Sequence, residues 1–258
     1  MSSEVELSRR DGILTVALSR PEKRNAMSST MLSRLVEVFG SLGEDAETRV
    51  VVVRGAGRSF CAGLDLAEMA AAKAAKGTVG LTEIEDVFHD LERAPQPTIA
   101  MVQGEAIAGG CELALHCDLR VAAEDVKFAM PLARLGLALP FPLIQRLLDS
   151  IGTAQTKELL FTGEFFRAER ALALGMVNRL VPVADLEKET YALATTIAAN
   201  APLALRAMKR AIFRSGAYRR TIEHEDYAEE VARVARSEDV VEGVAAMREK
   251  RTPRFQGR

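Results

Sequence analysis

In the first half of the chain, strand-like and helix-like patterns of hydrophobic and polar positions follow one another. Short apolar runs rich in β-branched residues predict strands at Ile13–Leu18, Val50–Val53 and Thr98–Val102. The run Val50–Val53 is apolar at every position, which is typical of a strand covered on both faces. Apolar residues at helical spacing predict a helix from Ser28 or Ser29 that ends near residues 40–43.

The second half changes from mixed to mostly helical patterns. A turn over residues 104–110 leads into a helix that we expect to begin at about Cys111. Short strands are predicted at 119–123, 126–129 and 177–181. From Phe141 onward the pattern is mostly helical, with spans near 153–162, 167–174, 185–199 and 203–214 and a charged, helix-rich end over 218–250. Strands that alternate with helices and are followed by a helical run favour an α/β fold with a terminal helical module.

Composition excludes several classes of protein. The chain has 258 residues, 48% hydrophobic and 27% charged, as expected for one large globular domain or a domain with a helical extension. A formal net charge of -2, 5% aromatic residues and no Trp argue against nucleic acid as a partner. The most apolar stretch, 98–117, carries Glu105 and Glu112, so no membrane span is expected. Three cysteines without a CxxC pair favour a reduced, cytoplasmic setting.

Common nucleotide, nucleophile and metal motifs are incomplete in this sequence. After Gly55 and Gly57, the third glycine position of a dinucleotide-binding loop is Phe60, and no phosphate-binding P-loop occurs. Ser59 lacks the glycine that a nucleophile elbow requires, because Cys61 stands there. The three histidines, at positions 89, 116 and 224, have no metal-ligand spacing. We therefore expect no metal, and each histidine is interpreted as a surface or core residue.

Two separated glycine-containing segments, 59–69 and 103–123, share one pattern. Each is expected to contain a strand, a turn and the beginning of a helix. Such turns leave backbone N–H groups unpaired at the positive end of a helix dipole. Two of them together could hold an oxygen that becomes negative during a reaction, and Gly109 and Gly110 permit close approach by a ligand. Glu112 follows these glycines and is a candidate acid/base. Its alternative role is a helix N-terminal acid that favours the dipole.

These segments resemble the crotonase (enoyl-CoA hydratase/isomerase) superfamily over nearly the whole chain. The resemblance runs from the sequence RPEKRNA at 20–26, through both turns, to SED at 237–239 and EKRTPRF at 249–255. It implies an α/β, crotonase-like spiral of ββα units over residues 1–200. It also implies a C-terminal helical region, residues 201–258, for trimerisation and capping of the site. The expected assembly is a homotrimer or a dimer of trimers.

The same resemblance implies roles for particular residues. The backbone N–H groups of Leu64 and Gly109 would form the oxyanion hole for the thioester carbonyl of an acyl-CoA, and Glu112 would be the principal acid/base. The coenzyme A contacts would come from Arg24, Ala62, Asp65 and Leu66. Coenzyme A is then part of the substrate, and no separate cofactor is expected. Apart from that role, Asp65 is expected to stabilise its turn through its side chain.

The chain departs from the hydratase pattern at the second family glutamate, which is Leu132 here. The acyl pocket is expected to be more apolar on this side, with Leu132, Leu137, Leu139 and Phe141 as its lining. A single-glutamate hydratase, a malonyl-type decarboxylase similar to methylmalonyl-CoA decarboxylase and a double-bond isomerase all remain open, and Glu105 is a possible replacement carboxylate. From a different class, a non-catalytic scaffold or RNA-binding member of the superfamily also remains open.

Overall fold

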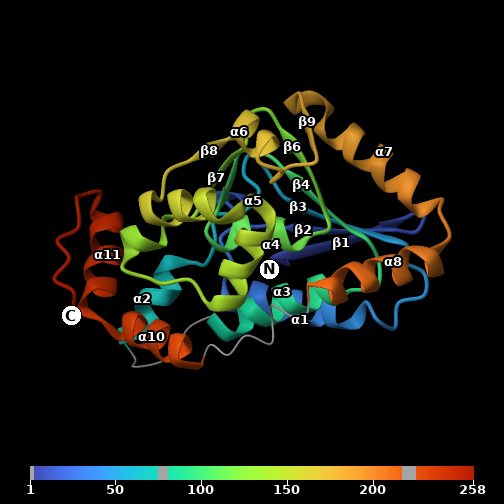
Figure 1. Ribbon diagram of the computed structural model, residues 1–258. Helices are drawn as coiled ribbons and strands as arrows, with labels where there is room; N and C mark the ends of the chain where they lie inside the picture. The colour runs from blue at the N-terminus through green and yellow to red at the C-terminus, as the bar shows by residue number, and fades with distance from the viewer. Residues whose placement is uncertain (1–2, 75–80, 217–224) are drawn as a thin grey trace.

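A mixed sheet forms the centre of the computed structural model, which describes residues 3–74, 81–216 and 225–258 (Figure 1). Strands β1 (Val5–Arg10) and β2 (Ile13–Leu18) form an antiparallel hairpin whose tight turn has positive φ at Asp11 and Gly12. The other strands join in parallel: β3 (Val50–Gly55), β4 (Thr98–Val102), β6 (Leu119–Ala123) and β9 (Arg179–Val181). Within the described ranges this sheet has the order β1-β2-β3-β4-β6-β9.

Both faces of the sheet are covered. Val51 and Val53 join the larger core with helices α1 (Ser29–Ser41) and α3 (Leu81–Arg93). Val50 and Val52 point to the opposite face, where helix α7 (Leu186–Ala198) packs. This division confirms the prediction of a strand buried on both sides.

A smaller sheet contains β5 (Glu105–Ile107), β7 (Lys127–Ala129) and β8 (Phe166–Arg167) among the residues described. Strand β5 follows β4 after a turn at Gly104, whose φ is +62°, and leads directly into helix α4 (Gly109–His116). The chain therefore leaves the large sheet, forms one strand of the small sheet and immediately begins the helix that carries Glu112.

The C-terminal half is mainly helical. It contains α5 (Phe141–Thr162), α6 (Ala168–Ala173), α8 (Pro202–Ser215), α10 (Glu225–Arg236) and α11 (Glu238–Glu249), with short 3₁₀ turns η2 (Pro131–Leu135) and η3 (Val183–Asp185). Helix α11 lies against η2 so closely that a Cβ on Gly243 would be 2.5 Å from the carbonyl carbon of Leu135. Figure 1 shows α10 and α11 at one end of the molecule and α8 toward the other.

Several sequence predictions need correction. Strand β1 and helix α3 were not predicted as such, helix α2 (Leu66–Ala74) was predicted only as the beginning of a helix in segment 59–69, and β5 lies inside the stretch predicted as a turn. Helix α4 begins at Gly109 and not near Cys111, whereas α5 begins at Phe141, where the helical pattern was predicted to start, and contains the predicted span 153–162 after its kink. Gly152 has non-helical backbone angles and kinks α5, which broke the helical pattern in the sequence. Part of the predicted helix-rich end, residues 217–224 with His224, lies outside the described residues.

Among the described helices, none combines the length and the apolar character that a membrane crossing requires. All three cysteines are free and buried. Within the same residues no group of three or more His, Cys, Asp or Glu side chains is arranged to hold a metal ion.

Candidate active site

The two glycine-containing turns lie side by side. The N–H of Cys61 donates to the carbonyl of Glu105 over 3.1 Å, and the N–H of Ile107 donates back to the carbonyl of Cys61 over 3.0 Å. A Cβ built on Gly110 would lie 2.1 Å from the carbonyl oxygen of Cys61, so only a glycine fits there. A Cβ on Gly63 would lie 3.1 Å from the backbone nitrogen of Gly109. The two segments are therefore in direct backbone contact at the beginning of α4.

Two backbone N–H groups remain available at this contact. The N–H of Met27 donates to the carbonyl of Gly63, and the N–H of Asp65 donates to the carbonyl of Met27. Because the chain is extended here, the N–H of Leu64 points away from Met27. Neither this N–H nor that of Gly109, in the first turn of α4, has a hydrogen-bond acceptor in the part of the chain that the structure describes. Their role as oxyanion donors stays a prediction.

Ala108, the residue before these helical N–H groups, has strained backbone angles. Its φ of 50° and ψ of −118° lie outside the regions that alanine usually occupies. Its N–H donates to the carbonyl of Ala129 over 2.8 Å, which ties the strained residue to β7. Strain of this kind persists only where the surroundings impose it, and it is common where a backbone group must face a ligand.

Glu112 is completely buried in the first turn of α4. Among the described residues, neither carboxylate oxygen has a hydrogen-bond partner. Burial raises the pKa of Glu112 to about 8, although the nearby Arg146 guanidinium acts to lower it. A buried carboxyl group with a pKa near neutrality and free lone pairs is suited to accepting and returning a proton.

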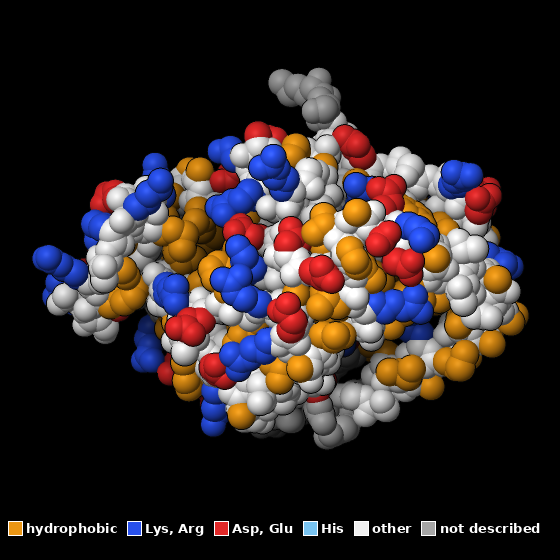
Figure 2. All heavy atoms as spheres, turned by 90° about the horizontal axis from the view of Figure 1, so that it is seen from above, with side chains coloured by type: hydrophobic (Ala, Val, Ile, Leu, Met, Phe, Trp, Pro, Cys, Tyr) orange, Lys and Arg blue, Asp and Glu red, His pale blue; other side chains and the backbone are white. Residues whose placement is uncertain are grey.

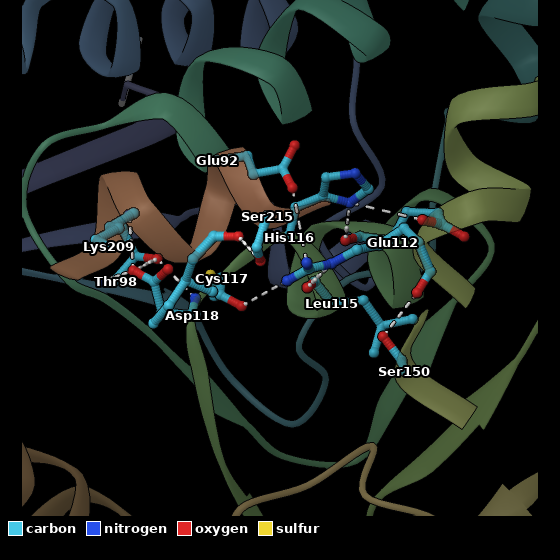
Figure 3. Close-up of polar contacts among 12 residues, drawn as sticks. Glu92, Thr98, Glu112, Leu115, His116, Cys117, Asp118, Ser150, Lys209 and Ser215 are labelled. Atoms are coloured by element: carbon cyan, nitrogen blue, oxygen red, sulfur yellow. Dashed lines mark hydrogen bonds and ion pairs between the residues drawn. The ribbon is translucent and has the colours of Figure 1, made fainter. Parts of the chain in front are cut away.

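Polar groups from three helices surround Glu112 (Figure 3). The Nδ1 of His116, one turn further along α4, lies 3.6 Å from Oε2 of Glu112 and 2.8 Å from its carbonyl oxygen. Arg146 of α5 donates from Nε to the carbonyl of Leu115 over 2.6 Å and pairs with Glu92 of α3 at 3.7 Å. These contacts fix the far end of α4 against its neighbours.

The residues expected around coenzyme A lie at and near the same turn. The N–H of Ala62 donates to the carbonyl of Arg24 over 3.0 Å. Asp65 accepts from the N–H of Ala67 and pairs with Arg20, and these interactions hold its pKa below the ordinary value against the opposing effect of burial. Asp65 thus stabilises the turn, as predicted.

Arg24 itself is exposed and forms an ion pair with Glu105 at 2.9 Å. Both side chains border a surface hollow of about 760 Å³ that Arg58, Lys127 and Arg167 also line. Glu112 is not part of that lining. Glu105 pairs with Arg24 at the surface, whereas Glu112 lies in the interior.

The comparisons with known proteins agree with this geometry. Residues 8–258 match the family model described as enoyl-CoA hydratase/isomerase. The chain belongs to the enoyl-CoA hydratase/isomerase family. It is 36% identical to a probable enoyl-CoA hydratase, echA6, of Mycobacterium leprae, with 98% of this chain and 99% of that protein covered. It is 35% identical to a short-chain-enoyl-CoA hydratase of Clostridium acetobutylicum, with 82% of each covered.

The fold is that of the family as well. A crystal structure of methylmalonyl-CoA decarboxylase superposes with a TM-score of 0.87 over 100% of both chains, at 28% identity. The predicted α/β crotonase fold is thereby confirmed, together with the membership that the two glycine-containing segments indicated.

The four residues predicted to line the acyl pocket contact different neighbours, and their role in a pocket stays a prediction. Leu132 and Leu139 pack with the main core, whereas Leu137 packs with Leu135 and helix α11. Phe141 contacts Tyr227 of α10 edge to face, with ring centroids 6.4 Å apart. Tyr227 also donates from its hydroxyl to the carbonyl of Leu139 over 3.0 Å. Helix α10 therefore contacts the predicted pocket segment directly.

Sequence reasoning did not assign a role to His116 or Arg146 in this site. His116 was interpreted as a surface or core residue, and the structure places it in the core beside Glu112. The signal was present in the sequence, because residues four apart in a helix share one face. Arg146 gave no comparable signal, since its approach to α4 depends on how α5 packs.

The raised pKa of Glu112 predicts an unusual pH dependence of stability. Between about pH 4.5 and 8 the folded protein holds a proton on Glu112 that the unfolded chain has released. The free energy of unfolding should therefore fall as pH rises through this window, by at most about 1.4 kcal/mol per pH unit. Glu112→Gln should remove this component. Urea unfolding of both proteins from pH 5 to 9 measures it, and equal slopes for the two would contradict it.

Proposed function

We propose that this family member adds water to a 2-enoyl-CoA, with Glu112 as its single catalytic carboxylate. One observation carries the proposal: among the described residues, the buried Glu112 carboxylate has no hydrogen-bond partner, and it stands in the first turn of the helix that begins at Gly109. The close contact between Gly109 and Gly63, the neighbour of Leu64, supports a shared site, since a Cβ on Gly109 would lie 3.5 Å from the Cα of Gly63. Both relatives named above as hydratases support this choice of reaction.

The proposed reaction uses few protein groups. Ionised Glu112 takes a proton from a water molecule, whose oxygen forms a bond to C3 of the substrate. The electron pair of the C2–C3 double bond moves toward the thioester, and the resulting negative oxygen accepts hydrogen bonds from the N–H groups of Leu64 and Gly109. The carboxylic acid of Glu112 then returns the proton to C2. One carboxylate can perform both transfers, so Leu132 does not prevent hydration.

Coenzyme A in this proposal lies along the first turn, with Arg24, Ala62, Asp65 and Leu66 as its contacts and no separate cofactor. The support is the position of these residues at and beside Leu64, whereas the hollow next to Arg24 is lined by basic and acidic side chains alike. Arg24→Ala is expected to weaken coenzyme A binding about fivefold, equivalent to about 1 kcal/mol for one exposed charge. Isothermal titration measures this, with Arg34→Ala, which removes an exposed arginine paired only to Glu37 among the described residues, as the control.

A malonyl-type decarboxylase is the second candidate function. It is supported by Leu132 in place of the second glutamate and by the structural similarity to methylmalonyl-CoA decarboxylase. Decarboxylation needs the oxyanion hole and a proton donor but no second base. A double-bond isomerase that shuttles a proton with Glu112 uses the same groups. An RNA-binding role has less support, since basic and acidic side chains are intermixed on the face seen in Figure 2.

One assay distinguishes these reactions. The purified protein is incubated in heavy water with 2-enoyl, 3-enoyl, malonyl and methylmalonyl thioesters of coenzyme A, and product masses are recorded. Gain of one water by a 2-enoyl thioester is the expected result. Loss of carbon dioxide would favour the decarboxylase. If no thioester changed mass or acquired deuterium, the proposed chemistry would be wrong.

We also propose a homotrimer or a dimer of trimers in the cytoplasm. Helix α8 exposes Leu203, Met208 and Ile212, which are 76%, 54% and 73% accessible in the single chain. Large apolar side chains on one helix favour contact with another copy. Three free cysteines favour a reducing compartment. Light scattering of the purified protein measures its mass in solution, and a monomeric mass would contradict the assembly.

A further inference from the structure

His116 is a buried titratable group that the proposed reaction does not use. The residue is 5% exposed, and it is the last residue of α4, four positions after Glu112. Its ring stacks on Phe88 of α3 with centroids 4.8 Å apart and an interplanar angle of 14°. The stack and the hydrogen bond to the Glu112 carbonyl together fix the ring in one orientation.

In that orientation the imidazole faces the catalytic carboxylate. Figure 3 shows the His116 ring and the Glu112 side chain on the same side of α4, with Nδ1 directed toward both the carbonyl and Oε2 of Glu112. At 3.6 Å an opposite charge strongly favours the ionised form of a buried carboxyl group. A histidinium at this position also lies at the negative end of the α4 dipole.

We propose that His116 is a positioning residue which, in its protonated form, favours ionisation of the Glu112 carboxyl group against the effect of burial and holds its side chain in one orientation. The inference rests on the proposed role of Glu112 as the acid/base. His116 in this account touches neither water nor thioester and acts through Glu112. It makes the site a carboxylate–imidazole pair, where hydratases of the family use two glutamates.

The charged groups around the pair come from neighbouring elements. Glu92 of α3 carries a negative charge, while Arg146 of α5 and Arg120 of β6 carry positive charges. Both arginines donate to carbonyls at the end of α4, including that of Cys117. Glu92 offsets Arg146, and the carboxylates of Asp118 and Glu112 offset Arg120 and Lys209 of α8, which pairs with Asp118. Protonation of His116 then leaves the site with one excess positive charge, which suits a reaction whose enolate is negative.

The test is the pH dependence of turnover in His116→Asn. Asparagine can still donate to the Glu112 carbonyl from near the Nδ1 position but cannot carry a positive charge. Burial would then oppose ionisation of Glu112 without a positive charge at position 116. The acid limb of the kcat/KM profile should therefore shift to higher pH by about one pH unit or more. We expect at least tenfold lower activity at pH 6.5 and recovery toward the parent value at pH 9. His89→Asn, on the exposed face of α3, is the matched control and should leave the profile unchanged.

A second measurement is independent of turnover. Carbon-13 NMR of the Glu112 carboxyl group, assigned with Glu112→Gln, reports its titration in the parent and in His116→Asn. His116→Phe serves the same purpose if the asparagine variant does not fold, because it keeps the ring stack on Phe88. A higher pKa of Glu112 in the variant supports the inference. An unshifted titration, or a loss of activity that is equal at every pH, overturns it. If the parent converts no enoyl thioester, the proposed function fails, and the NMR titration still decides the role of His116.

Discussion

Replacing Glu112 by glutamine is expected to lower kcat for hydration by about 10³-fold, within the range typical of a lost acid/base group. Glutamine has nearly the same shape but can neither take a proton from water nor return one to carbon. The N–H groups of Leu64 and Gly109 are unchanged, so coenzyme A thioesters should bind with dissociation constants within a few-fold of the parent. Stopped-flow turnover and calorimetric titration with a product analogue measure the two quantities separately.

Glu105→Gln is the matched control for this experiment. It removes a carboxylate from β5, only seven positions earlier (112 − 105), but one that forms a surface ion pair with Arg24. We expect kcat to remain within about twofold, since surface ion pairs contribute little. If Glu105→Gln lost turnover and Glu112→Gln did not, Glu105 would be the working carboxylate and the assignment of Glu112 would be wrong.

Local patterns were sufficient to predict most strands and the position of the site. The paired turns could be recognised because glycines, a following helix and Glu112 occur together within short segments. Helix α3 was not predicted, although the buried residues Ile84, Val87, Phe88 and Leu91 stand at helical spacing in LTEIEDVFHDLER. This spacing was a signal of its buried face that the sequence prediction missed.

Contacts between distant segments could not be predicted from the sequence. Arg146 reaches the end of α4 because α5 crosses it, and Tyr227 reaches Leu139 because α10 folds back over the pocket segment. Both contacts join residues that share no periodic pattern. The acyl-pocket lining of Leu132, Leu137, Leu139 and Phe141 stays a prediction, since their contacts with different neighbours do not test whether they share one pocket.

The contact between the two turns leads to the second large prediction, for Gly110→Ala. In the helix alone, alanine would be favoured over glycine by about 1 kcal/mol. Here the new Cβ would lie 2.1 Å from the carbonyl oxygen and 2.7 Å from the carbonyl carbon of Cys61. Both are backbone atoms, so the two turns must separate. We expect a loss of about 3 kcal/mol in the free energy of unfolding.

The same displacement should also lower kcat, because the N–H groups of Leu64 and Gly109 stand on opposite sides of this contact. Separating them removes one donor from the thioester oxygen, which corresponds to about a 10²-fold fall in kcat. Urea unfolding at fixed protein concentration and steady-state kinetics measure both effects. Gly43→Ala is the control, since a Cβ there meets no atom within 4 Å, and it should change stability by less than about 1 kcal/mol. If Gly110→Ala matched this control in stability and in kcat, close contact of the turns would not be what assembles the oxyanion hole.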